Sequence, residues 1–324
     1  MNRYCALVVT YNRPKLLLRC LNELVGQSLK LNAIVVVDNG SSVETMERLA
    51  ENGYMDVSST TESGDDTIIS DYLKNDVTIH YRKLKSNKGP GYAFHYGVKL
   101  FFEMNYDWLW MMDDDGYPDR ECLKHLDKYK ATGEFLNSLV IDEENKGRLA
   151  FGLCVKGGGS LILTRQDACK VSDNGLIFGS VNPFNGTFVS RSLVNSIGFP
   201  LCQMYGWGVE VEYEKRALKN GFSVATIVES MHFHPKCRVE QVSFLNGRYK
   251  LSLQSNRSNN YIYLRNYSYI LWRYGGRVAM LKFFVLYTCF FVTRMKIPGY
   301  LSFLIAFFHG IIGRWGYENK YLNK

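Results

Sequence analysis

The chain has 324 residues, 46% of them hydrophobic, which is enough to bury one large core or two ordinary ones and excludes an intrinsically disordered protein. Its net charge of +8 is unevenly distributed. Residues 236–324 carry fourteen Lys and Arg against two acids, a net +12, whereas residues 1–235 carry 25 against 29, a net −4. Because aromatic and aliphatic residues accompany these cations, the basic segment favours an anionic membrane surface over nucleic acid as a partner.

The cysteines and the N-terminus both indicate a cytoplasmic protein. The eight cysteines are scattered and form no CxxC pair of the kind typical of zinc or thiol redox sites, which favours a reduced compartment. Met1 is followed almost directly by an apolar strand pattern, without the features of a signal peptide. We therefore expect a cytoplasmic location and no secretion.

The first third of the chain alternates between strand and helix patterns, which predicts an α/β fold with a parallel sheet. Apolar runs predict strands at 5–9, 33–37, 77–81 and 108–112, with helices after Pro14 and over 92–104. The polar, acidic stretch between Gly53 and Asp76 is expected to be a surface insertion without chemistry.

The remaining chain divides at about residue 235. Short strands separated by glycines are expected from 151 to 235, with a helix through Glu212 and Arg216. We expect a catalytic domain over 1–235, with a nucleotide-binding half at about 1–118 and an acceptor-binding half at about 119–235, and a C-terminal helical region over 236–324.

Two apolar runs in the C-terminal region, 278–292 and 297–312, are shorter than the roughly 20 residues that span a bilayer. In-plane amphipathic helices on a membrane surface are the first interpretation. Helices packed against the catalytic domain and a re-entrant hairpin remain as alternatives.

Three adjacent aspartates, Asp113, Asp114 and Asp115, end the predicted strand 108–112. Their mutual repulsion is relieved by a cation, and Mg²⁺ or Mn²⁺ accepts carboxylate and phosphate oxygens together. Such an ion neutralises the charge on a nucleotide diphosphate as it leaves. The alternative is a helix N-cap or a solvated turn, where Asp is also common.

A second motif combines an aromatic residue with acids. Trp207 and Gly208 precede Glu210 and Glu212, either of which could deprotonate an acceptor hydroxyl as a general base. Trp207 offers a flat apolar face to a sugar ring. In the alternative interpretation the acids only occupy the first turn of a helix, where the helix dipole favours negative charge.

Other candidate residues follow predicted strands. His232 or His234 could bind a metal or contact a pyrophosphate, although such a histidine often makes only a structural hydrogen bond. Asp38 could accept hydrogen bonds from a base or ribose, and the Asn87-Lys88 loop before a helix could let a nucleotide approach closely. A strand-end Asp is often only a turn former.

The order of these motifs resembles the family-2 inverting glycosyltransferases, over roughly residues 4–235. The resemblance rests on Thr10-Tyr11-Asn12-Arg13, Val37-Asp38-Asn39-Gly40-Ser41-Ser42, Asn87-Lys88-Gly89, Asp113-Asp114-Asp115 and the Trp207-Gly208 pair followed by acids. Within the family, the segment Tyr261–Asn266 is similar to one in bacterial polysaccharide galactofuranosyl- and rhamnosyltransferases. The resemblance implies a GT-A fold.

Residue roles follow from this resemblance position by position. It implies a donor pocket formed by Thr10, Tyr11, Arg13, Asp38, Asn87, Lys88, Asp113 and Asp114. It implies Asp115 as the principal metal ligand, with Asp113 sharing the metal and with His232 or His234, which the sequence does not separate. Where many relatives have two aspartates, this chain has Val209 and Glu210, so Glu210 is the first candidate base and Glu212 the second, with Trp207 and Gly208 at the acceptor.

The resemblance also implies substrates. UDP-galactofuranose is the first donor expected and dTDP-rhamnose the second, with Mn²⁺ or Mg²⁺ as cofactor. The expected acceptor is a lipid-linked glycan at the inner face of the cytoplasmic membrane. Two rivals are a nucleotidyltransferase, which would need a glycine-rich run after the first strand, and a non-catalytic carbohydrate-binding scaffold at the membrane.

Overall fold

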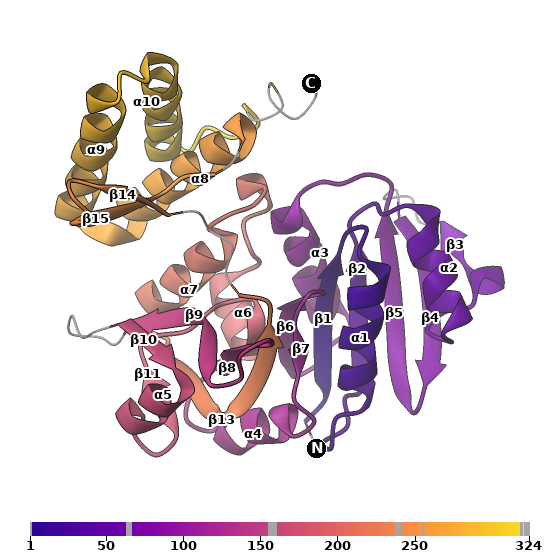
Figure 1. The fold of residues 1–324 in the computed structure, drawn as a ribbon. Coiled ribbons are helices and arrows are strands. Elements are labelled where there is room, and N and C mark those ends of the chain that lie inside the picture. The colour runs from indigo at the N-terminus through magenta and orange to yellow at the C-terminus, as the bar shows by residue number, and fades with distance from the viewer. Residues whose placement is uncertain are drawn as a thin grey trace. The chain divides into compact units, whose positions relative to one another are not determined.

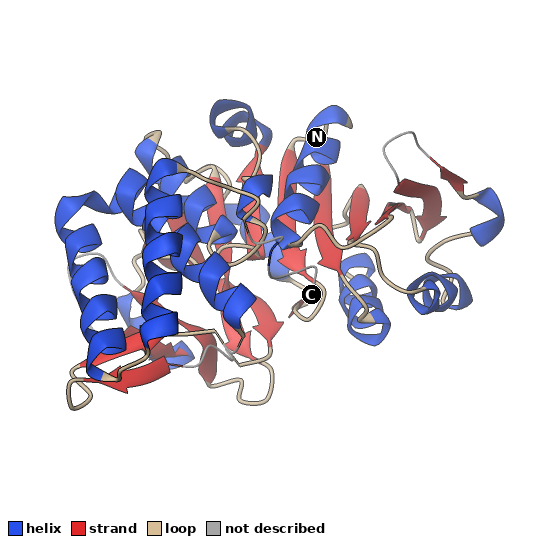
Figure 2. Ribbon diagram, turned by 90° about the horizontal axis from the view of Figure 1, so that it is seen from above, coloured by secondary structure: helices blue, strands red, loops and turns tan. Residues whose placement is uncertain are grey.

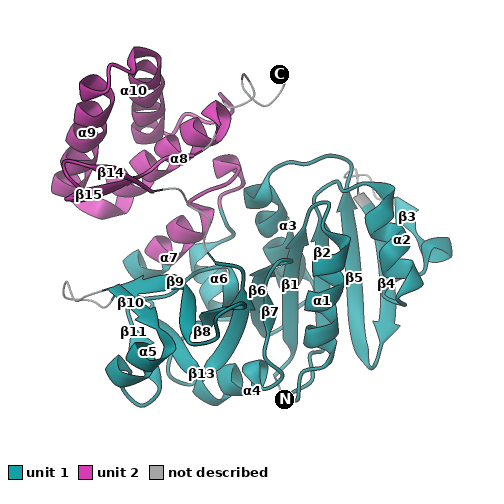
Figure 3. Cartoon of the chain, viewed as in Figure 1, with its two compact units in different colours: residues 1–200, 217–237 teal, residues 201–216, 238–324 magenta. Residues whose placement is uncertain are grey.

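The computed structural model describes residues 2–62, 67–154, 161–236, 241–254, 256–317 and 320. It divides into two compact units, which Figure 3 distinguishes by colour. Unit 1 consists of residues 1–200 and 217–237, and unit 2 of residues 201–216 and 238–324. The motif around Trp207, which the sequence analysis assigned to the catalytic domain, therefore groups with the C-terminal helices.

Unit 1 is a mixed α/β structure (Figure 1). Its elements are β1 (Tyr4–Thr10), α1 (Pro14–Val25), β2 (Ala33–Asp38), α2 (Val43–Glu51), η1 (Val57–Ser59), β3 (Thr61–Glu62), β4 (Thr67–Lys74), β5 (Val77–Leu84), α3 (Pro90–Glu103), β6 (Trp108–Asp113), β7 (Tyr117–Pro118), α4 (Cys122–Tyr129), β8 (Phe135–Asp142), β9 (Arg148–Cys154), β10 (Leu161–Thr164), α5 (Arg165–Val171), β11 (Leu176–Phe178), β12 (Asn185–Ser190), α6 (Arg191–Ile197) and β13 (Val224–His234).

Parallel strands form the centre of the sheet, whose order is β10-β9-β8-β12-β6-β1-β2-β5-β4-β3. β1 lies between β2 and β6 and is parallel to both, with Val9 opposite Asp113 and Thr10 opposite Asp38. The carboxyl ends of these three strands are therefore level. Beyond β6 the pairing becomes antiparallel through β12, which makes the sheet mixed.

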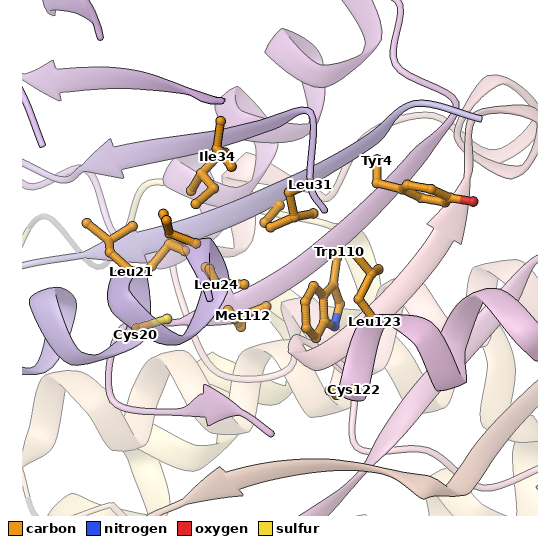
Figure 4. Packing of buried hydrophobic residues seen from close by; sticks show 14 of the residues in the cluster. Tyr4, Cys20, Leu21, Leu24, Leu31, Ile34, Trp110, Met112, Cys122 and Leu123 are labelled. Carbon is orange, nitrogen blue, oxygen red and sulfur yellow. The ribbon is translucent and has the colours of Figure 1, made fainter. Parts of the chain in front are cut away.

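Helices cover both faces of this sheet, as the view in Figure 2 shows. On one face α1, α2 and α4 bury Leu21, Leu49 and Leu123 against β1, β2 and β6. Figure 4 shows Leu21 and Leu123 in this cluster. On the other face α3 approaches so closely that a Cβ added to Gly97 would collide with the Leu7 side chain. The expected α/β architecture is confirmed.

The polar stretch 53–76 is not only a surface insertion. Much of it forms β4, which pairs antiparallel with β5 along its whole length. The connection is the two-residue turn Asn75-Asp76, in which both residues have positive φ (51° and 66°), as tight hairpins require. Residues 63–66 of the stretch lie outside the described residues.

Unit 2 contains η2 (Cys202–Met204), most of α7 (Val209–Lys219), β14 (Gln241–Phe244), β15 (Tyr249–Ser252), α8 (Arg257–Ile270), η3 (Leu271–Gly275), α9 (Gly276–Thr293) and α10 (Ile297–Ile312). α9 and α10 pack through aromatic side chains such as Phe290 and Phe303. Arg257–Thr293 is long and apolar enough to cross a membrane, by length and composition alone. Gly276 interrupts its helical path, because φ 79° and ψ 164° lie outside the helical region.

Candidate active site

The loops that leave the three level strands of unit 1 are tied to one another. The Asn39 amide donates to the Thr10 carbonyl (2.9 Å), and the Asn12 amide donates to Ser41 Oγ (2.8 Å). Asn12 Oδ1 in turn accepts from the Ser42 amide (2.8 Å). These bonds fix the edge at which open α/β sheets bind ligands.

Asp114 faces the interior and connects the acid triplet to the exit of β1. Its side chain is fully buried, accepts a hydrogen bond from Thr10 Oγ1 (2.6 Å) and lies 3.3 Å from Arg13 Nε. Burial raises the pKa of Asp114 to about 6, although the Arg13 charge and the Thr10 hydrogen bond oppose that rise. Thr10 and Asp114 thus engage each other below the surface, whereas Tyr11 is 41% exposed. Their contact with a donor remains a prediction.

Asp113 and Asp115 carry opposite pKa shifts. Burial, together with the charges of Asp115 and Asp114, raises the pKa of Asp113 to about 8. Burial also acts to raise the pKa of Asp115, but the hydrogen bond and charge of His234, with the charge of Arg13, hold it below its ordinary value. Arg13 Nη1 lies 2.6 Å from Asp115 Oδ2, so one guanidinium spans two aspartates. Such strongly perturbed carboxylates are typical of functional sites.

β13 brings His234 to the triplet. The strand runs parallel to β8, and its end pairs with β7, where Phe233 lies opposite Tyr117. His234 Nε2 consequently lies 3.1 Å from Asp115 Oδ1. The other ring nitrogen, Nδ1, lies 2.6 Å from the Pro235 carbonyl, and donating to that oxygen orients the ring.

His232 occupies a different environment. Its side chain is fully buried, and neither ring nitrogen has a hydrogen-bond partner among the described residues. Burial is the main cause that lowers the pKa of His232 to about 3, so the ring is neutral. A Cβ added to Gly116 would collide with His232 Nε2, which explains why a glycine follows the triplet. Of the two histidines that the sequence left unresolved, His234 is the one beside the Asp115 carboxylate.

The donor groups at this edge suit a divalent ion. Carboxylate oxygens and an imidazole nitrogen are ligands for Mn²⁺, and Mg²⁺ usually takes one or two carboxylates plus substrate phosphates. Asp115 and His234 lie side by side, and Asp113 is electrostatically coupled to both. In the part of the chain that the structure describes, no group of three or more His, Cys, Asp or Glu side chains is arranged so that it could hold a metal ion. Metal binding by Asp115 and His234 remains a prediction.

Asp38, at the end of β2, is fully buried and makes two hydrogen bonds within the protein. Its Oδ1 accepts from the Ser41 amide (2.7 Å) and its Oδ2 from the Tyr81 hydroxyl (2.5 Å). Burial and the nearby Asp38 charge raise the pKa of Tyr81, so Tyr81 remains a donor. Asp38 thereby fixes the loop after β2, and its contact with a nucleotide remains a prediction.

The loop that contains Asn87 and Lys88 packs against the loop after β2. Asn39 Oδ1 accepts from the Lys88 amide (2.9 Å), and Asn39 Nδ2 donates to Asn87 Oδ1 (3.0 Å). Gly40 has φ +82°, and a Cβ there would lie 2.5 Å from the Ser86 carbonyl carbon. The two loops therefore meet through their backbones, next to the ends of β2 and β5.

Arg19 is a site residue that the sequence analysis missed. Its Nη2 donates to the Asp115 carbonyl (3.0 Å), and its Nη1 pairs with Glu143 (2.7 Å). The guanidinium lies over the Tyr117 ring, 4.3 Å from its centre. An acid triplet predicts nearby cations, but the sequence does not show which basic residue of α1 faces it.

The two candidate bases lie in unit 2, at the start of α7. Both Glu210 oxygens accept from the Gly208 amide (3.1 and 3.0 Å). Burial raises the pKa of Glu210, opposed by the amides of Glu210 and Gly208. Glu212 is buried and engaged through both oxygens, by the Tyr274 hydroxyl (2.7 Å) and by Arg216 (2.9 Å). Among the residues that the structure describes, no side chain bonds to Glu210 in this way. Glu210 therefore remains the stronger candidate for the base.

Trp207 and Gly208 form a strained turn before that helix. Trp207 has φ 22° and packs partly against the aromatic core of unit 2. Gly208 has φ 95°, and a Cβ there would lie 3.1 Å from Ile270 Cδ1. Their contact with an acceptor sugar stays a prediction.

Comparison with known proteins shows what the chain is similar to. Residues 5–63 and 57–149, which include the triplet, match the family model described as glycosyl transferase family 2. Galactofuranosyltransferase GlfT1 of Mycolicibacterium smegmatis is 25% identical over 303 residues, covering 91% of this chain and 92% of the relative. The chain is a glycosyltransferase that resembles family 2 over residues 5–149. GlfT1 of Mycobacterium tuberculosis is 24% identical over 300 residues, covering 90% of each chain.

Solved structures share the fold of this glycosyltransferase. S. aureus TarS 1–349 in complex with UDP-GlcNAc has a TM-score of 0.56 and 14% identity, covering 95% of this chain and 81% of that one. GalNAc-T7 with UDP, GalNAc and Mn²⁺ has a TM-score of 0.52 and 15% identity, covering 84% and 48%. The predicted GT-A fold is confirmed. Because the chain is a glycosyltransferase, the nucleotidyltransferase and the non-catalytic scaffold no longer apply.

Replacing Tyr81 with Phe tests the hydrogen bond that fixes the loop after β2. The substitution leaves the buried Asp38 Oδ2 without its donor, so we expect the free energy of unfolding to fall by about 1–3 kcal/mol. Urea denaturation measures the change. The control is Tyr72→Phe on β4, because the Tyr72 hydroxyl has no partner among the described residues and its loss should be nearly neutral. Equal stability of the two variants would contradict this role of Tyr81.

Proposed function

We propose that this enzyme is a family-2 glycosyltransferase that transfers galactofuranose from UDP-galactofuranose to a hydroxyl group of a glycan, with inversion at the anomeric carbon. Two relatives named galactofuranosyltransferases, which match about nine-tenths of the chain, support this donor. dTDP-rhamnose is the second candidate. The observation that carries the proposal is the Asp115–His234 pair beside two further aspartates at the carboxyl edge of the sheet.

The proposed reaction is a single displacement. The acceptor oxygen attacks the anomeric carbon opposite UDP, the bond from that carbon to the diphosphate oxygen breaks, and UDP leaves with the bonding electrons. Glu210 takes the proton of the acceptor hydroxyl, and its raised pKa makes it a stronger base than an ordinary glutamate. No covalent enzyme intermediate forms. Alignment of the two substrates supplies much of the rate enhancement.

Asp115 and His234 would hold Mn²⁺ or Mg²⁺, with Asp113 sharing the ion or contacting the ribose. When bound, such an ion neutralises charge on the diphosphate leaving group. Arg13 pairs with Asp114 and Asp115 and is 43% exposed, so its guanidinium would also contact a phosphate bound beside these aspartates.

Replacing Glu210 with Gln tests the base. The amide keeps the shape of the side chain but cannot accept the proton, so we expect kcat to fall by about 10²–10⁴-fold. Transfer of radiolabelled galactofuranose and the affinity for UDP are measured together, and the affinity should not change. Glu212→Gln should instead lower the melting temperature, because it weakens the bond to Arg216. Full activity of the Glu210 variant would remove this residue from the mechanism.

Isothermal titration of UDP with and without Mn²⁺ tests the metal ligands. The native enzyme should bind UDP more tightly with Mn²⁺ than without it. Asp115→Ala or His234→Ala should reduce this Mn²⁺-dependent increase in UDP affinity by at least about 10-fold. The control is Asp71→Ala, which removes another Asp–His pair of unit 1, Asp71 with His80 (2.9 Å). A gain that survives in the Asp115 and His234 variants would contradict the proposed site.

We further propose that unit 2 holds the enzyme on the inner face of the cytoplasmic membrane, where a lipid-linked glycan is the acceptor. α9 and α10 each expose an apolar stripe at helical spacing, which together comprise Val278, Leu281, Val285 and Val292, and Ile297, Leu301, Ile305, Phe308 and Ile312. Exposed cations flank them, including Arg277, Arg294 and Lys296, and residues 241–317 contain no Asp or Glu. Apolar stripes flanked by cations match an anionic lipid surface.

Co-sedimentation with vesicles that contain anionic lipid tests this surface in the full-length chain. Each buried Leu contributes roughly 1.5–3 kcal/mol, so the double variant Leu281→Glu/Leu301→Glu should bind at least about 100-fold more weakly. The control is Leu73→Glu on β4 of unit 1, where the leucine is 64% exposed, against 61% for Leu281 and 54% for Leu301. If the native chain, the double variant and the control sediment with the vesicles to the same extent, the proposed membrane contact through α9 and α10 is contradicted.

A further inference from the structure

The segment before α7 has an unusual backbone. Tyr205 has φ 65° and ψ −57°, and the Gly206 amide donates to the Met204 carbonyl (2.8 Å), which closes a tight three-residue γ-turn. Trp207 and Gly208 also have positive φ. A non-glycine residue adopts such a conformation stably only where its surroundings enforce it.

Asn266, on α8, supplies that enforcement. Its side chain is fully buried, and its Nδ2 donates to three carbonyl oxygens of the turn: Met204 (2.9 Å), Gly206 (2.6 Å) and Trp207 (2.8 Å). A side-chain amide carries two hydrogens, so both are used and one of them is shared between two of these three acceptors. The turn is therefore built around one amide group.

Arg265 determines which way that amide faces. Arg265 Nε donates to Asn266 Oδ1 (3.0 Å), so the nitrogen of the amide must face the turn. Arg265 Nη2 also donates to the Met204 carbonyl (3.0 Å), and the guanidinium lies over the Trp315 ring at 4.9 Å. The pair Arg265-Asn266 thus acts as one hydrogen-bonding unit.

The same peptide group connects Asn266 to Glu210. The Trp207 carbonyl and the Gly208 N–H belong to one planar peptide. Its oxygen accepts from Asn266, and its N–H donates to both oxygens of Glu210. We propose that Asn266, oriented by Arg265, is a positioning residue that sets the plane of this peptide and thereby the placement of the Glu210 carboxylate. The inference rests on the proposed role of Glu210 as the base.

A double-mutant cycle tests the inference, with kcat and KM measured for the native enzyme, Asn266→Ala, Glu210→Gln and the double variant. Misplacement of a catalytic group by about 1 Å costs about 100-fold in rate, so Asn266→Ala should lower kcat by about that factor while KM for the donor stays within about twofold. In the Glu210→Gln background the same substitution should change kcat by less than about threefold, because the residue that Asn266 positions is already disabled.

The pH profile gives a readout that a purely structural role would not move. Burial raises the pKa of Glu210 and the backbone amides lower it. In Asn266→Ala the peptide is no longer held, so the Gly208 amide should bond Glu210 less well and lower its pKa less. The pKa of Glu210 should then be higher, and the acidic limb of the kcat profile should move to higher pH. Ser268→Ala is the control, because Ser268 is buried on the same helix and bonds only the Leu264 carbonyl (2.7 Å) among the described residues.

The outcomes separate the inference from the proposed function. An equal fall in kcat in both backgrounds, or an acidic limb that stays in place, overturns the positioning role and leaves Glu210 as the base. Full activity of Glu210→Gln overturns both. If Asn266→Ala does not fold, Arg265→Lys takes its place in the cycle, since it keeps the charge but removes the Nε–H that orients the amide, and the same non-additivity is expected.

Discussion

The electrostatic cost of three consecutive aspartates at the end of β6 is the constraint on which the site depends. Desolvation and mutual repulsion both favour protonated carboxyl groups, as the raised pKa values of Asp113 and Asp114 show. The chain offsets this with a hydrogen bond from Thr10 and charges from Arg13 and His234. These partners come from the exit of β1 and the end of β13, so the acid triplet draws together segments more than a hundred residues apart.

At two glycines near the aspartate triplet, backbone segments and side chains pack too closely for a larger residue. Glycine follows the triplet because His232 fills the space that a side chain would need, and Gly40 lets the loop after β2 touch the one after β5. In unit 2 the proposed mechanism requires that the Glu210 carboxylate be held in position. The peptide group between Trp207 and Gly208, which Asn266 holds, provides that position. The two units thus hold different parts of the proposed chemistry, a leaving-group site in unit 1 and a base in unit 2.

The sequence predicts those features that local pattern determines. Strands β1, β2 and β6 were predicted because buried parallel strands are continuous apolar runs, and the triplet was found because it directly follows such a run. β4 was missed because half of its eight residues are polar, so it has no continuous apolar run, although Asn75-Asp76 was a usable turn signal. Neither the choice between His232 and His234 nor the role of Arg19 could be read from the chain. The first depends on the pairing of β13 with β7 and the second on the packing of α1 beside β7, and these segments are distant in sequence.

Anomalous diffraction at the manganese edge, from crystals grown with UDP and Mn²⁺, tests the central claim most directly. The account predicts a single strong peak within coordination distance of Asp115 Oδ1 and His234 Nε2, with the diphosphate of UDP on its other side. Manganese and UDP bound elsewhere, with the three aspartates free of both, would contradict it.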